Sequence, residues 1–109
     1  MERMGHCIRL RPEKVDEYKR LHAAVWPGVL ATITACNLRN FSIFLKEPEL
    51  LLFAYWEYVG SDFAADMRKM AEDPVTREWW SHTDPCQEPF ETRASGEHWA
   101  KMEEVFFHP

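Results

Sequence analysis

The chain has 109 residues, of which 46% are hydrophobic and 14% aromatic, and its formal net charge at pH 7 is −5. This length predicts a single domain spanning residues 1–109. Because Lys and Arg are scattered through an acidic chain, neither nucleic acid nor an anionic membrane is expected as a partner. The sequence also lacks an apolar run near the roughly 20 residues that a membrane helix needs.

The cysteines and the N-terminal residues indicate a compartment. Cys7, Cys36 and Cys86 form no Cys-x-x-Cys pair, and an odd set of this kind is typical of free thiols in a reducing compartment. The first residues contain no apolar segment like that of a signal peptide. We therefore expect a cytoplasmic protein.

The first third of the chain predicts a strand and two helices. Residues 4–10 alternate between two faces, which is typical of a strand. Pro12 suits the first turn of a helix, which we expect to run to about Ala24. Trp26-Pro27 breaks that helix, and a second, shorter one follows and ends near Asn37.

The middle of the chain predicts a hairpin followed by two more helices. Residues 38–45 and 50–58 are apolar, strand-like runs that a short polar turn separates, which is typical of an antiparallel hairpin. Asp62 is a plausible N-cap for a helix. Asp73-Pro74 predicts the start of another short helix, which includes Trp79 and Trp80.

The last third is predicted to be a loop followed by a strand. Residues 82–96 are polar and indicate a loop, and residues 101–108 alternate as a final strand. The order β-α(α)-β-β-α(α)-β is that of the α+β, ferredoxin-like split βαβ fold, with a four-stranded antiparallel sheet and helices on one face. The other sheet face needs a cover, and a second copy is expected to supply it, which predicts a homodimer.

Three side chains with helical spacing suggest a functional site. Tyr18, His22 and Trp26 are four residues apart and would share one face of the first helix. Histidine exchanges protons near neutral pH, and Trp79-Trp80 would supply an opposite aromatic wall. The competing interpretation is an amphipathic helix whose aromatic side chains only fill the core.

Several other chemistries lack their motifs. The histidines have no metal-ligand spacing, no Gly-x-Ser-x-Gly elbow is present, and the four glycines form no phosphate-binding loop. We therefore expect neither a metal nor a cofactor.

The chain resembles the L-rhamnose mutarotases, which interconvert the anomers of a 6-deoxy sugar. The resemblance covers nearly the whole chain and is carried by these motifs in order: Tyr18-x-x-x-His22, Trp26-Pro27, residues 40–45 (Asn-Phe-Ser-Ile-Phe-Leu), residues 51–54 (Leu-Leu-Phe-Ala), Trp79-Trp80 and residues 104–106 (Glu-Val-Phe). It implies a dimeric ferredoxin-like fold without a cofactor. It also implies that His22 is the proton donor and that Tyr18, Trp79 and Trp80 bind a monosaccharide.

One sugar-binding position departs from the family pattern. The family usually has Tyr-Ala-Ile where this chain has Phe41-Ser42-Ile43, so Phe41 keeps the ring and loses the hydroxyl. A lost hydrogen bond removes roughly 0.5–1.5 kcal/mol. Polar contacts separate sugar epimers, so the resemblance leaves L-fucose or another 6-deoxy sugar as an alternative substrate.

The expected mechanism is acid–base ring opening and closure. His22 is assigned as general acid to the ring oxygen, with Tyr18 as its orienting partner, while His6 is one option for the second group. Three other classes of protein stay open at this point. They are a cofactor-free monooxygenase that acts on an aromatic polyketide, a non-catalytic sugar-binding module and a structural dimerisation domain.

Overall fold

The computed structural model describes residues 1–109, and its elements follow the predicted order. The strands are β1 (Glu2–Leu10), β2 (Leu38–Lys46), β3 (Leu51–Tyr58), β4 (Gln87–Glu88) and β5 (Ala100–Met102). The helices are α1 (Val15–His22), α2 (Pro27–Ala35), α3 (Phe63–Glu72) and α4 (Pro74–Thr83), with short 3-10 turns at Pro12–Lys14 and Asp84–Cys86. None of these helices has the length and apolar character needed to cross a membrane.

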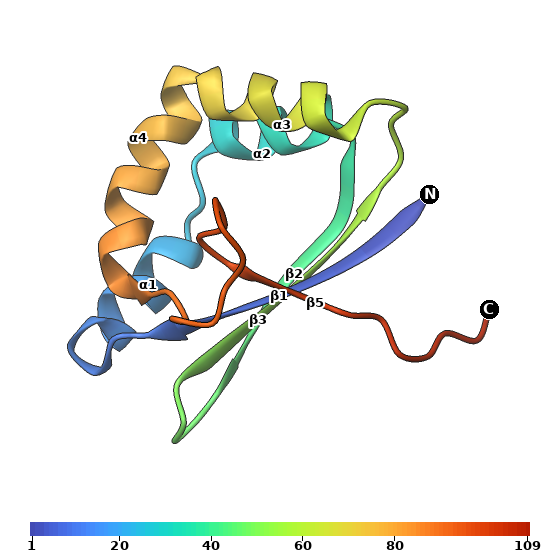
Figure 1. Cartoon of the computed structure of the whole chain (residues 1–109). Coiled ribbons are helices and arrows are strands. Elements are labelled where there is room, and N and C mark those ends of the chain that lie inside the picture. The colour runs from blue at the N-terminus through green and yellow to red at the C-terminus, as the bar shows by residue number, and fades with distance from the viewer.

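The strands form one antiparallel sheet in the order β2-β3-β1-β4, with β5 also paired to β1. β4 and β5 share the free edge of β1, where β4 pairs with Arg9 and Leu10 and β5 pairs with residues 5–7. The predicted α+β, ferredoxin-like fold is confirmed, with its fourth strand divided into two short pieces. Figure 1 shows the four helices gathered on one side of the sheet, while the C-terminal segment extends away on the other.

Local signals in the sequence account for several helix ends. Pro27 and Pro74 stand in the first turns of α2 and α4, where a missing N–H costs nothing. Asp62 and Asp73 cap α3 and α4, because their carboxylates accept hydrogen bonds from the backbone N–H groups of Ala65 (3.1 Å) and Thr76 (2.9 Å). These four signals fix how the helices enter the layer that covers the sheet.

The two faces of the sheet have different surroundings. Ile8, Leu52 and Ala54 point toward the helices and are buried. On the opposite face, Cys7 pairs with Phe53, which pairs in turn with Phe44, and the Phe44 side chain is 64% exposed. The helices therefore cover only one face.

The first helix is shorter than predicted. α1 ends at His22, not near Ala24, and Trp26 has extended backbone angles (φ −62°, ψ 134°). Proline disfavours helical backbone at the residue before it, so Pro27 takes Trp26 off the helix. The prediction that Tyr18, His22 and Trp26 form one helical row is therefore wrong for Trp26.

The last third also differs from the prediction. Residues 82–96, predicted as a loop, contain the end of α4, a 3-10 turn and β4. The final strand covers only Ala100–Met102 instead of residues 101–108. Beyond it, Arg3 binds Glu104 at 3.0 Å and lies over the Phe107 ring, so side-chain contacts replace the strand ladder there.

Candidate functional site

A cavity of about 420 Å³ lies between the covered face of the sheet and the helices. This volume falls within the range of about 300–1,000 Å³ that is typical of small-molecule sites. Most of its lining is hydrophobic, and it includes these polar or aromatic residues: Tyr18, His22, Phe41, Trp56, Thr76, Trp79, Trp80, Thr83, Asp84, Gln87, His98 and Trp99.

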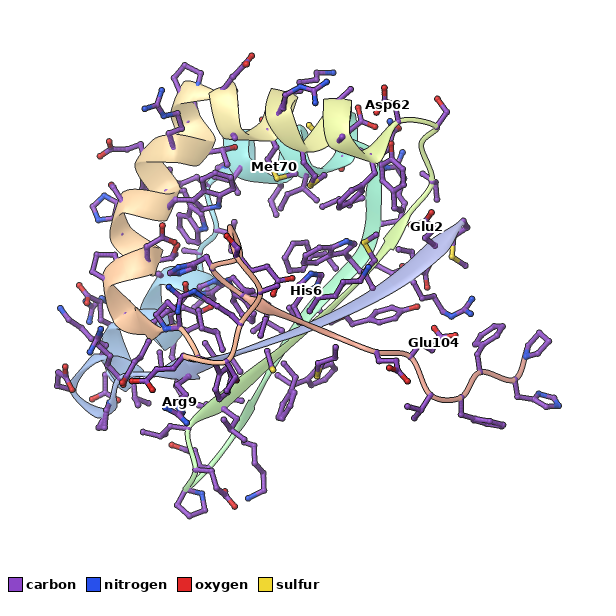
Figure 2. All side chains as sticks on the ribbon, in the orientation of Figure 1. Glu2, His6, Arg9, Asp62, Met70 and Glu104 are labelled. Carbon is purple, nitrogen blue, oxygen red and sulfur yellow. The ribbon has the colours of Figure 1, made fainter.

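The cavity separates two parts of the hydrophobic core. One cluster contains Ile8, Tyr18 and Leu52, and the other contains Leu38 and Met70. Tyr18, Leu38 and Met70 all line the cavity, so its walls are parts of the core itself. Figure 2 labels Met70 on α3, which lines this space, and His6 on β1.

A second hollow, of about 900 Å³, lies along β5 and the C-terminal segment. It is an open groove lined by charged side chains that include Arg3, Arg93, Lys101 and Glu104. It contains neither the histidines nor the tryptophans of the smaller cavity. We therefore place the candidate site in the smaller cavity, which lies between the two core clusters.

His22 and Tyr18 stand together on α1, one turn apart. Their rings are 4.2 Å apart, and His22 Nδ1 lies 2.9 Å from the backbone oxygen of Tyr18. A carbonyl oxygen only accepts hydrogen bonds, so Nδ1 carries the proton. In the neutral ring, Nε2 is then left with a free lone pair.

Burial sets the protonation state of both groups. It lowers the pKa of His22, and the hydrogen bond to the Tyr18 carbonyl opposes that shift. Burial also raises the pKa of Tyr18 to about 12, against a smaller opposing effect of Gln87. At neutral pH the site therefore contains a neutral imidazole beside a neutral phenol.

A buried amide connects Tyr18 to a second histidine. Gln87 is only 4% exposed, and its Nε2 donates to Tyr18 Oη at 3.2 Å. Its Oε1 accepts from His98 Nε2 at 2.8 Å. Asp84 Oδ1 lies 3.7 Å from the same His98 nitrogen, and burial raises the pKa of Asp84.

The two adjacent tryptophans of α4 have different surroundings. Trp79 is buried, and its ring meets His22 and Trp26 edge-on at 5.4 and 5.2 Å. Trp80 is half-buried and packs beside the cluster that contains Met70. Trp26 contacts Trp79 and His82 but does not line the cavity.

The sheet supplies a further aromatic group. Phe41 is 38% exposed and lines the cavity, with its ring 5.2 Å from that of Trp56. His6 stacks on the Trp56 ring, with 4.4 Å between the ring centroids. It does not line the cavity, and burial lowers its pKa. This geometry favours a core role for His6 over that of second acid–base group.

The predicted site residues come together at one cavity. His22, Tyr18, Phe41, Trp79 and Trp80 all line it, although they come from α1, β2 and α4. Their roles stay predictions. Trp56, Asp84, Gln87, His98 and Trp99 also line the cavity but were not predicted as site residues. The last four lie within or next to a segment without strand or helix periodicity. No group of three or more His, Cys, Asp or Glu side chains is placed to hold a metal ion.

The fold and this cavity define a class of protein: small ferredoxin-like α+β domains with a histidine and a tyrosine side by side in an aromatic cavity. Residues 3–108 match the family described as L-rhamnose mutarotase. The chain belongs to this family. A relative named L-rhamnose mutarotase from Rhizobium meliloti is 32% identical over 99% of this chain and 98% of its own. Another so named from Oceanobacillus iheyensis is 33% identical over 78% of this chain and 79% of its own.

Solved structures agree in fold. The L-rhamnose mutarotase from Formosa agariphila superposes over the whole of both chains with a TM-score of 0.78 at 21% sequence identity. The tetracenomycin F2 cyclase from Streptomyces glaucescens, a type-II polyketide cyclase, superposes with a TM-score of 0.73 at 13% identity, over 100% of this chain and 98% of its own. At these identities the two structures show a shared fold only.

Proposed function

We propose that this protein is an isomerase that interconverts the α and β anomers of L-rhamnose. The observation that carries the proposal is the His22–Tyr18 pair on the wall of the cavity, in a chain of the L-rhamnose mutarotase family. Relatives bearing that name support this sugar over L-fucose and over a non-catalytic sugar-binding module.

The reaction needs two proton movements. The anomeric hydroxyl loses its proton, the bond from the anomeric carbon to the ring oxygen breaks, and the ring oxygen gains a proton. The product is the open-chain aldehyde. Rotation about the adjacent carbon–carbon bond presents the other carbonyl face, and the same steps in reverse close the ring as the other anomer.

We assign His22 to the anomeric hydroxyl. The bond from Nδ1 to the Tyr18 carbonyl and the lowered pKa favour Nε2 as a proton acceptor in the resting enzyme. His22 therefore acts as base in ring opening and returns the proton as acid in ring closure. This proposal differs from the sequence-based expectation, in which His22 was the acid toward the ring oxygen and the complementary base was not identified.

Tyr18 is assigned as the hydrogen-bond donor to the ring oxygen. A phenol with a pKa of about 12 keeps its proton at neutral pH, so it is suited to donating a hydrogen bond. Tyr18 gives its hydroxyl proton to the ring oxygen as the carbon–oxygen bond breaks, because the alkoxide that develops there is a stronger base than the phenolate. When the ring closes, the attacking hydroxyl returns that proton to Tyr18, so Tyr18 and His22 both regain their resting protonation states.

The aromatic residues are assigned as the walls for the sugar. Trp79 contacts His22 edge-on and holds its ring in place, so we assign the stacking surface to Trp80. Phe41 extends that wall from β2. At this position the ring packs against Trp56, which supports a packing role that does not require the family's usual hydroxyl.

Saturation-transfer proton NMR on equilibrated L-rhamnose tests the proposal, with L-fucose measured in parallel. We expect anomer exchange of L-rhamnose to accelerate in proportion to enzyme concentration, and by more than that of L-fucose. Binding without acceleration would instead indicate a sugar-binding module. If no sugar binds, the remaining hypotheses are a cofactor-free monooxygenase and a structural dimerisation domain.

We also propose a cytoplasmic homodimer. Phe44 on the uncovered sheet face and Val105 and Phe106 on the C-terminal segment are 64%, 87% and 80% exposed, and a second copy would bury such a surface. The cysteines are free, which suits a reducing compartment. Light scattering tests the assembly: Phe44→Glu should give monomers, whereas the control Leu30→Glu, on exposed α2 surface, should leave dimers.

A further inference from the structure

We propose that Gln87 is a positioning residue that forces the Tyr18 hydroxyl to donate its hydrogen into the cavity. The inference rests on the proposed function and goes beyond it, because it explains which way the Tyr18 proton points. Gln87 is buried on β4, and its amide bridges two side chains of the cavity wall, Tyr18 and His98.

The direction of these hydrogen bonds is set from the His98 end. The Asp84 carboxylate lies 3.7 Å from His98 Nε2 and favours a proton on that nitrogen. Nε2–H then donates to Gln87 Oε1 at 2.8 Å, which fixes the amide with its oxygen toward His98. The nitrogen of the same amide must therefore face Tyr18.

This amide orientation decides the role of the phenol. Gln87 Nε2 is a donor only, so Tyr18 Oη accepts from it at 3.2 Å. The phenol hydrogen is then not used by the protein at that contact and is available to a ligand oxygen. With the amide reversed, Tyr18 would donate to Gln87 and offer the ligand only lone pairs.

The surroundings make this orientation of the Gln87 amide costly to reverse. Tyr18 belongs to a core cluster with Ile8, Leu10, Leu52 and Cys86, where an unpaired polar group costs more than it does in water. Gln87 also pairs with Leu10 in the sheet, so its backbone cannot move away easily. The bridge consequently holds one arrangement of donors before any sugar binds.

The test is a double-mutant cycle on the rate of L-rhamnose anomer exchange. Gln87→Met keeps an unbranched side chain and removes the amide. Gln87→Glu keeps the shape of the side chain, but an ionised carboxylate can only accept hydrogen bonds. We expect either change to lower kcat about 10-fold, the size of one lost neutral hydrogen bond, with KM little changed. The control Glu88→Gln, at the exposed neighbouring position on β4, should leave both constants unchanged.

The Tyr18→Phe background distinguishes positioning from general damage. If Gln87 acts through the phenol, Gln87→Met should add less than a twofold loss to that of Tyr18→Phe. Multiplicative losses, or full activity of Gln87→Glu, would overturn the inference and leave the proposed function standing. A wild-type protein that does not accelerate exchange would overturn both. Thermal unfolding of each variant checks that the folded protein is being compared.

Discussion

Replacing His22 by Phe removes both nitrogens while keeping an aromatic ring in the same place. The ring contacts with Tyr18 (4.2 Å) and Trp79 (5.4 Å) depend on shape and should persist. What disappears is the proton acceptor, together with the Nδ1 bond to the Tyr18 carbonyl. A single neutral hydrogen bond contributes about 1 kcal/mol to stability, so the variant should still fold.

The expected kinetic effect is much larger than the effect on stability. A positioned acid–base group accelerates a reaction by about 10²–10⁴, so the barrier to anomer exchange should rise by about 3–5 kcal/mol. Saturation-transfer NMR of the anomeric protons measures this directly. The matched control is His82→Phe, because His82 is a half-exposed histidine of α4 that does not line the cavity.

The pH dependence adds a second check on the same residue. Burial places the pKa of His22 below its usual 6.5, so the neutral form predominates at pH 7. The wild-type rate should rise with pH through that lowered pKa and be level around neutrality, and His22→Phe should lack the acidic limb. An exchange rate within threefold of wild type in His22→Phe would refute the assignment.

Three further variants test the fold and the sugar contact. Asp62→Ala should cost about 1 kcal/mol in urea unfolding, because Asp62 caps α3, whereas the neighbouring Ser61→Ala should cost little. Tyr58→Phe should lower the urea midpoint, because it removes the hydrogen bond from the Tyr58 hydroxyl to Asp66. That bond helps hold the pKa of Asp66 below its usual value. The difference in stability between wild type and variant should therefore be present above pH 4 and shrink as acid protonates Asp66. Phe41→Tyr should lower the KM for L-rhamnose by about 2- to 10-fold with kcat unchanged, and a raised KM would count against a sugar contact there.

Much of the fold could be predicted because its signals are local. The prolines at the starts of α2 and α4 and the caps Asp62 and Asp73 act within one turn, so the sequence carries them in full. The strands of the hairpin have the period of two that a half-covered sheet imposes. The end of α1 was misplaced by two residues, because apolar spacing continued past the point where Pro27 acts.

The candidate site could be predicted only where one helix or one dipeptide carries it. Tyr18 and His22 are one turn apart, and Trp79-Trp80 is visible as a pair. Gln87 and His98 meet only because β4 pairs with the end of β1, placing Gln87 opposite Leu10. A strand of two residues has no detectable period, so no pattern in the sequence marked this part of the cavity.

In the proposed mechanism, the position of His22 at the end of a short helix helps one imidazole to serve both directions of the reaction. The last carbonyl groups of a helix favour a positive charge. The hydrogen bond from His22 Nδ1 to the Tyr18 carbonyl raises the pKa of His22. Burial in the cavity lowers the same pKa and is the larger effect. We therefore propose that His22 rests as a neutral base and that the Tyr18 carbonyl stabilises the imidazolium that forms when the ring opens. A mutarotase needs this balance, since the proton taken in ring opening must be returned in ring closure.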